Sequence, residues 1–143
     1  MSNNTFIQNP YSKDNDFGFI PHMEKYPEFQ EGFIKLRVGK HRGPNRGFGV
    51  NHIWAEHKQY LIKKGYQDWG SVARFVADIL QPGSPIYCEF NNIRGNHRVA
   101  VVKSTLGQAI LEKKQDANNK IFYSVVTAFE GKNAHGTRIG TVR

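Results

Sequence analysis

The residues best suited to chemistry gather in and after a glycine-rich stretch in the first half of the chain. Residues 39–52 read GKHRGPNRGFGVNH, with four glycines among the basic side chains Lys40, His41, Arg42 and Arg46. Glycine lets a backbone approach a ligand closely, and the free N–H groups at a helix start favour an anion. The spacing is not that of a P-loop. The stretch predicts a phosphate-binding loop over 39–47, or alternatively a mobile basic loop without a specific ligand.

Two histidines belong to the helix that we expect to begin near Asn51 and to end near Lys64. His57 falls within the apolar stripe of that helix, so it is either a packed core residue or a general acid or base held at the edge of the core. His52 lies in the first turn, close to the basic loop. The two are about 140° apart around the helix and cannot bind one metal as an HExxH pair does. The sequence has a single cysteine, and it predicts no metal site and no structural zinc.

Polar side chains recur on the strands that we expect in the second half of the chain. Tyr123 and Thr127 share one face of the last long strand, because side chains alternate along a strand. Basic groups surround the second of these strands: Arg94, His97, Arg98 and Lys103. Cleavage of RNA without a metal needs a base, an acid and a cation, and these faces could supply them. The alternative is that they are solvent-facing residues of an ordinary sheet.

The elements that must position these groups point to an α+β fold. Residues 1–32 are acidic and without periodicity, which predicts a partly ordered arm before a basic domain over 33–143. After a possible short strand at 33–38, we expect helices at 51–64 and 71–80. Strands are expected at 85–91, 97–103, 108–114 and 120–129, and the tail could form another. The predicted fold is therefore N-terminal helices packed on a four- to five-stranded antiparallel sheet.

The charge is unevenly distributed along the chain, which has a formal net charge of +8. Residues 1–34 carry two lysines against five acidic residues, while the remainder carries 18 lysines and arginines against seven acidic residues. Such a field favours an anionic partner and salt-sensitive binding. No apolar run approaches the roughly 20 residues that span a bilayer, and the first residues lack the pattern of a secretory signal. We therefore expect no membrane partner.

The stretch GFGVNHIWAEH, residues 47–57, resembles the GFG-x-x-HI-x-x-x-H pattern of phage-associated and polymorphic-toxin nucleases of the barnase–EndoU–colicin–RelE superfamily. The resemblance covers about residues 33–130. It implies a metal-independent ribonuclease without a cofactor, delivered as a contact-dependent-inhibition-type toxin into the cytoplasm of a target cell and neutralised by an acidic immunity protein. His52 and His57 occupy the two motif histidines. The candidate partners on the strands are Arg98, Tyr123 and Thr127.

The sequence therefore predicts an endoribonuclease that cleaves RNA, with tRNA as one candidate, by attack of the 2′-hydroxyl. Phosphate would be held by Lys40, His41, Arg42 and Arg46 and by Arg94, His97 and Lys103. Two alternatives stay open. A non-catalytic nucleic-acid-binding module would use the same basic surface without His57. An ADP-ribosyltransferase-type toxin would need a catalytic glutamate, for which Glu89, Glu112 and Glu130 are the candidates.

Overall fold

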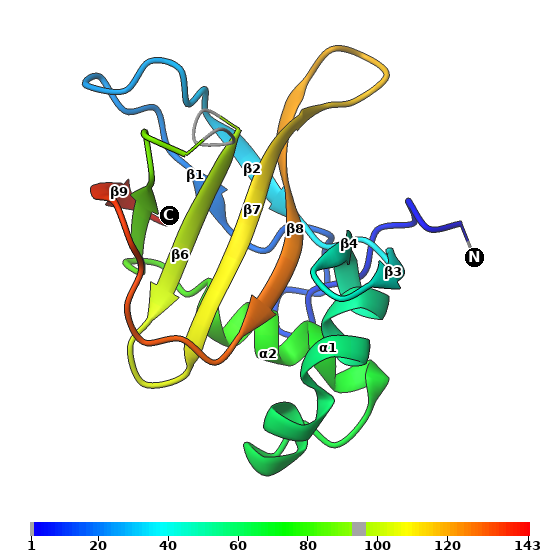
Figure 1. Cartoon of the computed structure of the whole chain (residues 1–143). Coiled ribbons are helices and arrows are strands. Elements are labelled where there is room, and N and C mark those ends of the chain that lie inside the picture. Colours follow the sequence, from blue (N-terminus) through cyan, green and yellow to red (C-terminus); the bar gives the residue numbers. More distant parts are fainter. Residues whose placement is uncertain (1, 93–96) are drawn as a thin grey trace.

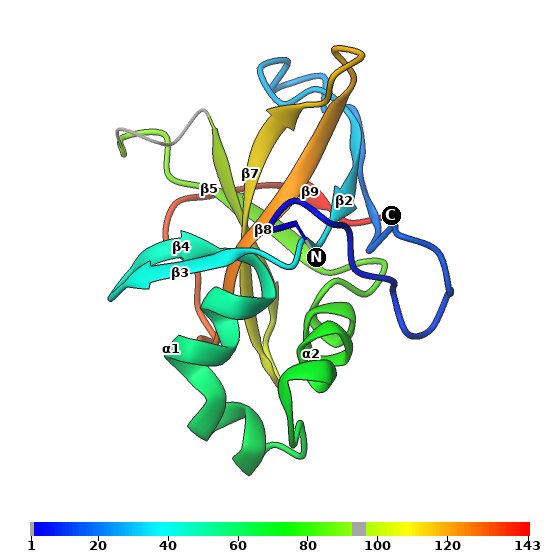
Figure 2. The same ribbon diagram turned by 90° about the vertical axis from the view of Figure 1, so that its right-hand side faces the viewer.

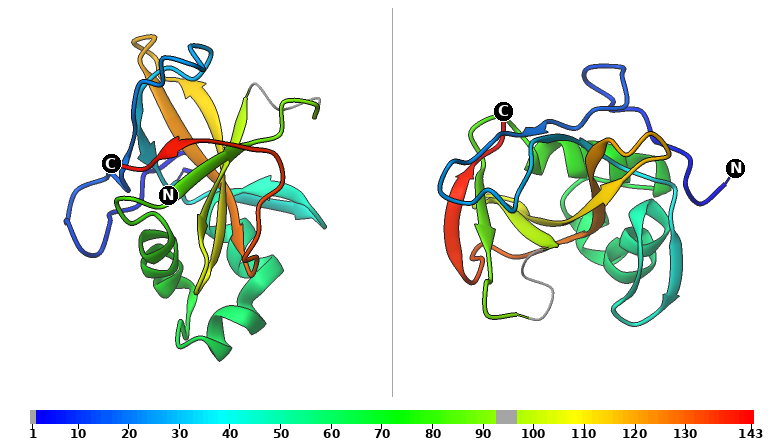
Figure 3. Two further views of the ribbon diagram at one scale, coloured as in Figure 1. Left: turned by 90° about the vertical axis from the view of Figure 1, so that its left-hand side faces the viewer. Right: turned by 90° about the horizontal axis from the view of Figure 1, so that it is seen from above.

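A curved seven-stranded sheet dominates the computed structural model, which describes residues 2–92 and 97–143 (Figure 1). The strand order is β1-β2-β8-β7-β6-β5-β9, and every neighbouring pair is antiparallel except the parallel pair β2–β8. The strand bounds are β1 Phe19–Ile20, β2 Gly32–Lys35, β5 Pro85–Cys88, β6 Arg98–Lys103, β7 Gly107–Gln115, β8 Ile121–Phe129 and β9 Thr137–Thr141. Seen from above, the sheet curls towards a barrel that is nearly closed (Figure 3).

The predicted fold class is wrong in its architecture. The sheet has seven strands rather than four or five, it is mixed rather than antiparallel, and short strands precede the helices. The parallel pairing of Phe33 with Phe122 joins segments almost ninety residues apart, and no local pattern in either segment specifies that pairing. Strands of two to four residues also contain too few positions for an alternation to be recognised.

The expected loop at 39–47 is a two-stranded hairpin, formed by β3 (Lys40–Gly43) and β4 (Arg46–Phe48). Its turn places Asn45 at φ +58°, a left-handed conformation that asparagine tolerates better than most residues. The hairpin stands apart from the large sheet and packs against the start of the first helix (Figure 2). The basic stretch is therefore a defined element rather than a loose loop.

Both predicted helices are present. Helix α1 runs over Gly49–Lys63, and α2 runs over Val72–Ile79 after the short 3₁₀ turn η1, Trp69–Ser71. Asn51 does not cap α1, because the helix begins two residues earlier with Phe48 at the N-cap and no side-chain cap. Instead, the Asn51 side chain donates to the Gly39 carbonyl and accepts a hydrogen bond from Trp69 Nε1. It thereby ties α1 to the hairpin entrance and to η1.

The core lies between α2 and the inner face of the sheet. Phe75 and Ile79 of α2 are fully buried together with Val101, Leu111 and Val125 of the central strands. The segment 1–32, expected as a partly ordered arm, packs into this core. Its buried side chains are Phe17, Ile20, Met23 and Phe29. None of the helices in the described part of the chain is long and apolar enough to cross a membrane.

Candidate functional site

Helix α1 covers the part of β8 that has no strand neighbour on one side. β2 pairs with β8 only over residues 122–124, and α1 and the hairpin pack beside the rest of the strand (Figure 2). This arrangement places the His57 ring against the Phe129 ring at the end of β8, with 5.7 Å between ring centroids. His57 is half-buried there rather than enclosed in the core. It therefore lies where the helix meets the outer face of the sheet.

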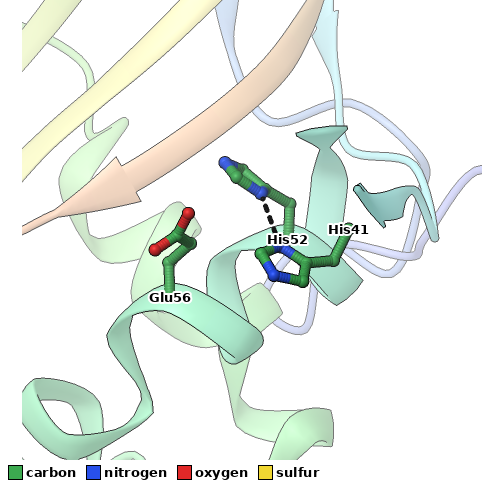
Figure 4. A group of neighbouring side chains, drawn as sticks. All are labelled: His41, His52 and Glu56. Atoms are coloured by element: carbon green, nitrogen blue, oxygen red, sulfur yellow. Dashed lines mark hydrogen bonds between the residues drawn. The ribbon is translucent and has the colours of Figure 1, made fainter. Parts of the chain in front are cut away.

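Three polar side chains converge between the hairpin and the start of α1 (Figure 4). His41 from β3 approaches His52 from α1 with 3.1 Å between the two Nδ1 atoms, and the rings are stacked. Glu56 lies one helical turn after His52, and its carboxylate accepts a 2.6 Å hydrogen bond from the Asn45 backbone N–H. One ligand atom from each of the three lies within 4.8 Å of the other two. We call His41, His52 and Glu56 the hairpin cluster.

A glycine in β4 makes room for this contact. Gly47 has φ +140°, and a side-chain carbon added there would lie 2.2 Å from the Lys40 carbonyl oxygen and 2.9 Å from His52 Nδ1. Any larger residue would therefore push the hairpin away from the imidazole or displace the ring. The glycine of the GFG motif thus has a structural reason next to His52.

The electrostatic environment keeps the two motif histidines neutral near pH 7. Burial lowers the pKa of His52 below its usual 6.5; the Glu56 carboxylate opposes this, and positive charge on His41 or His57 adds to it. Burial also lowers the pKa of His57, again against the pull of Glu56. Both imidazoles are therefore free bases at neutral pH and can accept a proton. The three histidines and Glu56 form one electrostatically coupled group.

The outer face of the sheet holds a cavity of about 880 Å³ beside this group. Its lining includes Phe129, the ring that His57 contacts, and the polar side chains of Arg98, Gln108 and His135. The cavity and the hairpin therefore lie on two sides of the helix segment that carries His52 and His57. Sequence reasoning missed His135 as a member of this surface, since nothing in the tail pattern links it to β6.

The candidate residues on the strands have different fates in the structure. Arg98 lines the cavity, and its Nε donates to Glu112 Oε2 at 3.0 Å, so its charge is already paired. Thr127 lies opposite Ile110, which lines the cavity. Its buried Oγ1 has no hydrogen-bond partner among the described residues. Tyr123 is fully buried, and its hydroxyl donates to the Gln30 carbonyl at 2.7 Å. Tyr123 therefore supports the packing of the N-terminal segment, and we leave it out of the site.

The candidate phosphate-binding residues divide into two groups. Lys40, His41, Arg42 and Arg46 are all exposed on the hairpin. His97 and Lys103 are exposed at the two ends of β6, on the other side of the sheet order from the hairpin. Arg94 lies outside the described residues. The structure therefore brings together the hairpin cations and the two motif histidines, but it does not place His97 and Lys103 with them.

The sequence analysis overlooked two members of the hairpin cluster in their actual roles. His41 was expected to hold phosphate, whereas its ring contacts His52. Glu56 was expected on the polar face of the helix, yet its spacing of four residues from His52 is the signal that could have placed it on the same side. The prediction of no metal site considered only His52 and His57, and the donors His41, His52 and Glu56 are sufficiently close to hold an ion.

The ADP-ribosyltransferase alternative would require a glutamate ready to act in a cleft. Glu112 is held by Arg98 Nε and Lys114 Nζ, each 3.0 Å from one of its carboxylate oxygens. Glu89 lines the cavity and Glu130 is exposed. The geometry around the histidines is thus more specific than that around any of the three glutamates.

The chain matches no protein-family model, no curated protein and no solved structure.

Proposed function

We propose that this protein cleaves RNA by attack of the 2′-hydroxyl on the adjacent phosphate, with His57 and His52 as the groups that transfer protons. The observation that carries the proposal is the position of the histidines between two surfaces. His57 contacts Phe129 in the cavity wall, and His52 contacts His41 in the cationic hairpin. A strand that lies across the hairpin and enters the cavity would pass both imidazoles.

The chemistry assigns a part to each group. A neutral imidazole can take the proton of the 2′-hydroxyl, and a second one that has become protonated can give its proton to the departing 5′-oxygen. The bond from phosphorus to the 5′-oxygen breaks as the bond to the 2′-oxygen forms, which leaves a 2′,3′-cyclic phosphate. Charge that develops on the phosphate would be met by Arg98 from the cavity side and by the hairpin cations, Lys40, Arg42 and Arg46.

The test is incubation of the full chain, in EDTA, with an RNA oligonucleotide pool and with the matching DNA pool. We expect RNA products that end in a 2′,3′-cyclic phosphate and no DNA products, because DNA lacks the attacking hydroxyl. RNA that is bound but not cut would contradict the proposal and favour a binding module. Cleavage that disappears in EDTA and returns with magnesium would contradict the metal-independent mechanism.

A toxin role is a further part of this proposal and rests on the resemblance of residues 47–57, together with the net charge of +8. A protein with this charge would be bound rapidly by an acidic partner, as an immunity protein would need to do. Expression of the chain in bacteria should arrest growth, and co-expression of an acidic protein encoded beside it should relieve the arrest. Normal growth with active, folded protein in the cell would contradict the toxin role.

A further inference from the structure

The hairpin cluster contains the donor types that zinc binds and holds them at a spacing that zinc requires. In a tetrahedral site with Zn–N distances of 2.0–2.1 Å, two ligand nitrogens lie about 3.3 Å apart. His41 Nδ1 and His52 Nδ1 are 3.1 Å apart. The two nitrogens therefore need to separate only slightly for a cation to sit between them. Without a cation, one of them must carry a proton for the contact to be attractive.

Glu56 supplies the third donor from the same side. His52 and Glu56 are four residues apart on α1, so their side chains leave the helix in nearly the same direction (Figure 4). The ligand atoms of all three residues lie within 4.8 Å of one another, and a carboxylate can cover the remaining distance by rotating about its side-chain bonds. Two imidazoles and one carboxylate leave a fourth position for water, as in other His₂Glu zinc sites.

The surroundings hold these donors in place. His52 is only 4% exposed, and Gly47 beside it keeps side-chain atoms away from its Nδ1. The Asn45 N–H binds the Glu56 carboxylate, and such hydrogen bonds orient metal ligands. The hairpin cations oppose a bound cation, so we expect weaker binding than in an all-cysteine structural site.

We propose that His41, His52 and Glu56 bind a divalent transition metal of the zinc class, which clamps the β3–β4 hairpin onto α1. Magnesium and calcium do not fit, because both prefer oxygen ligands and two of the three donors here are imidazole nitrogens. The ion joins an element whose exposed side chains are cationic to the helix that carries His52 and His57. The clamp does not depend on RNA cleavage, so the two proposals can fail separately.

The first experiment is calorimetric titration of the EDTA-treated, dialysed full chain with ZnCl₂ and with MgCl₂. We expect one zinc per chain and no heat from magnesium. Loss of a hydrogen-bond partner to a metal ligand already lowers affinity by about 10- to 100-fold, so His41→Ala and Glu56→Gln should each weaken zinc binding by at least that much. Zinc should also raise the melting temperature of the wild type, and this shift should vanish in both variants.

Two histidine variants serve as matched controls. His57→Ala removes an imidazole beside Glu56 that is not in the donor set, and His22→Ala removes an exposed one elsewhere; both should bind zinc as the wild type does. A wild type that takes up no zinc would overturn the proposal, as would unchanged affinity in His41→Ala and Glu56→Gln. Loss of binding in His57→Ala would overturn the donor set. Far-UV circular dichroism checks the fold of each variant.

A measurement on the wild type alone removes any dependence on variant folding. Nuclear magnetic resonance should show zinc-induced shifts in the imidazole signals of two histidines and small changes in the other four of the six. Shifts spread evenly over all histidines would indicate nonspecific binding and contradict the site. Failure of the RNA assay in EDTA together with a normal zinc titration would remove the proposed function and leave the metal site standing.

Discussion

At the scale of single residues, His57 is the position where packing and chemistry have to be separated. Its ring is half-buried against Phe129, and burial lowers its pKa. A histidine kept only for packing would lose contacts with this ring when it is truncated. A histidine that transfers protons would lose function while the fold remains.

We therefore expect His57→Ala to lower the rate of RNA cleavage by roughly 10²–10⁴-fold, with little change in the melting temperature. The rate and the melting curve are to be measured on the same preparation. His22→Ala is the control, because this histidine is exposed and distant in sequence from the motif. A well-folded His57→Ala protein that cleaves at the normal rate would remove His57 from the mechanism.

Glu112 is the residue whose ionisation we expect to affect stability in acid. Burial raises the pKa of its carboxyl group, but hydrogen bonds from Lys114 and Arg98 outweigh burial and hold the pKa below the ordinary 4.5. A carboxylate with a lowered pKa in the folded state stabilises the protein above its unfolded pKa. This stabilisation is lost as the pH falls through the folded pKa.

The free energy of unfolding of wild type and Glu112→Gln should accordingly differ at pH 7 and converge below about pH 4. Urea unfolding at a series of pH values measures both. The matched control is Glu24→Gln, at an exposed position, for which the two curves should stay parallel to the wild type. A constant difference between wild type and Glu112→Gln at all pH values would contradict the ion-pair explanation.

At the scale of elements, the hairpin is the unit that presents positive charge beside the histidines. Its three exposed cations lie within nine residues, on two strands that pack against α1. The guanidinium of Arg37 lies over the Phe48 ring, 4.1 Å from its centroid, and joins the end of β4 to the chain that follows β2. The hairpin is thus anchored at its base while its turn remains open to solvent.

Replacing Arg42 and Arg46 by Ala should weaken RNA binding for all sequences alike and lower the slope of log affinity against log salt by up to about two phosphate contacts. The control is the double variant Lys13→Ala, Lys25→Ala, which removes the same charge from exposed positions in the acidic segment. Affinity measured over a series of salt concentrations gives both slopes. Equal slopes for the two double variants would show that the hairpin does not contact phosphate.

At the scale of the whole molecule, the N-terminal segment and the basic remainder fold as one body. β1 pairs with β2 at the sheet edge, and the Phe19 N–H and carbonyl exchange hydrogen bonds with Arg143 at the opposite end of the chain. Lys35 pairs with Asp16, so an acid of the segment neutralises a cation at the sheet edge. The segment therefore contributes to the stability of the sheet that carries the cavity.

Phe29→Ala should cost about 3–5 kcal/mol in the free energy of unfolding, because Phe29 is fully buried beneath the sheet edge and its truncation leaves a cavity. Phe6→Ala is the matched control from the same segment, since the Phe6 ring is 39% exposed and its loss should cost much less. Chemical denaturation measures both. Equal small losses would indicate that the segment does not belong to the folded core.

The amino-acid sequence by itself determined the elements whose pattern is local and repeated. The apolar spacing of Val72, Phe75, Val76 and Ile79 specified α2, and alternation specified the long central strands, since both signals lie within a few residues. It also indicated the basic stretch beside His52 and His57. The tertiary structure decided the rest, because β2–β8 pairing, the curl of the sheet and the contact of His41 with His52 join segments that carry no sign of one another. Only the closed fold distinguishes Tyr123, enclosed by the N-terminal segment, from Thr127, which faces the same side as the cavity wall.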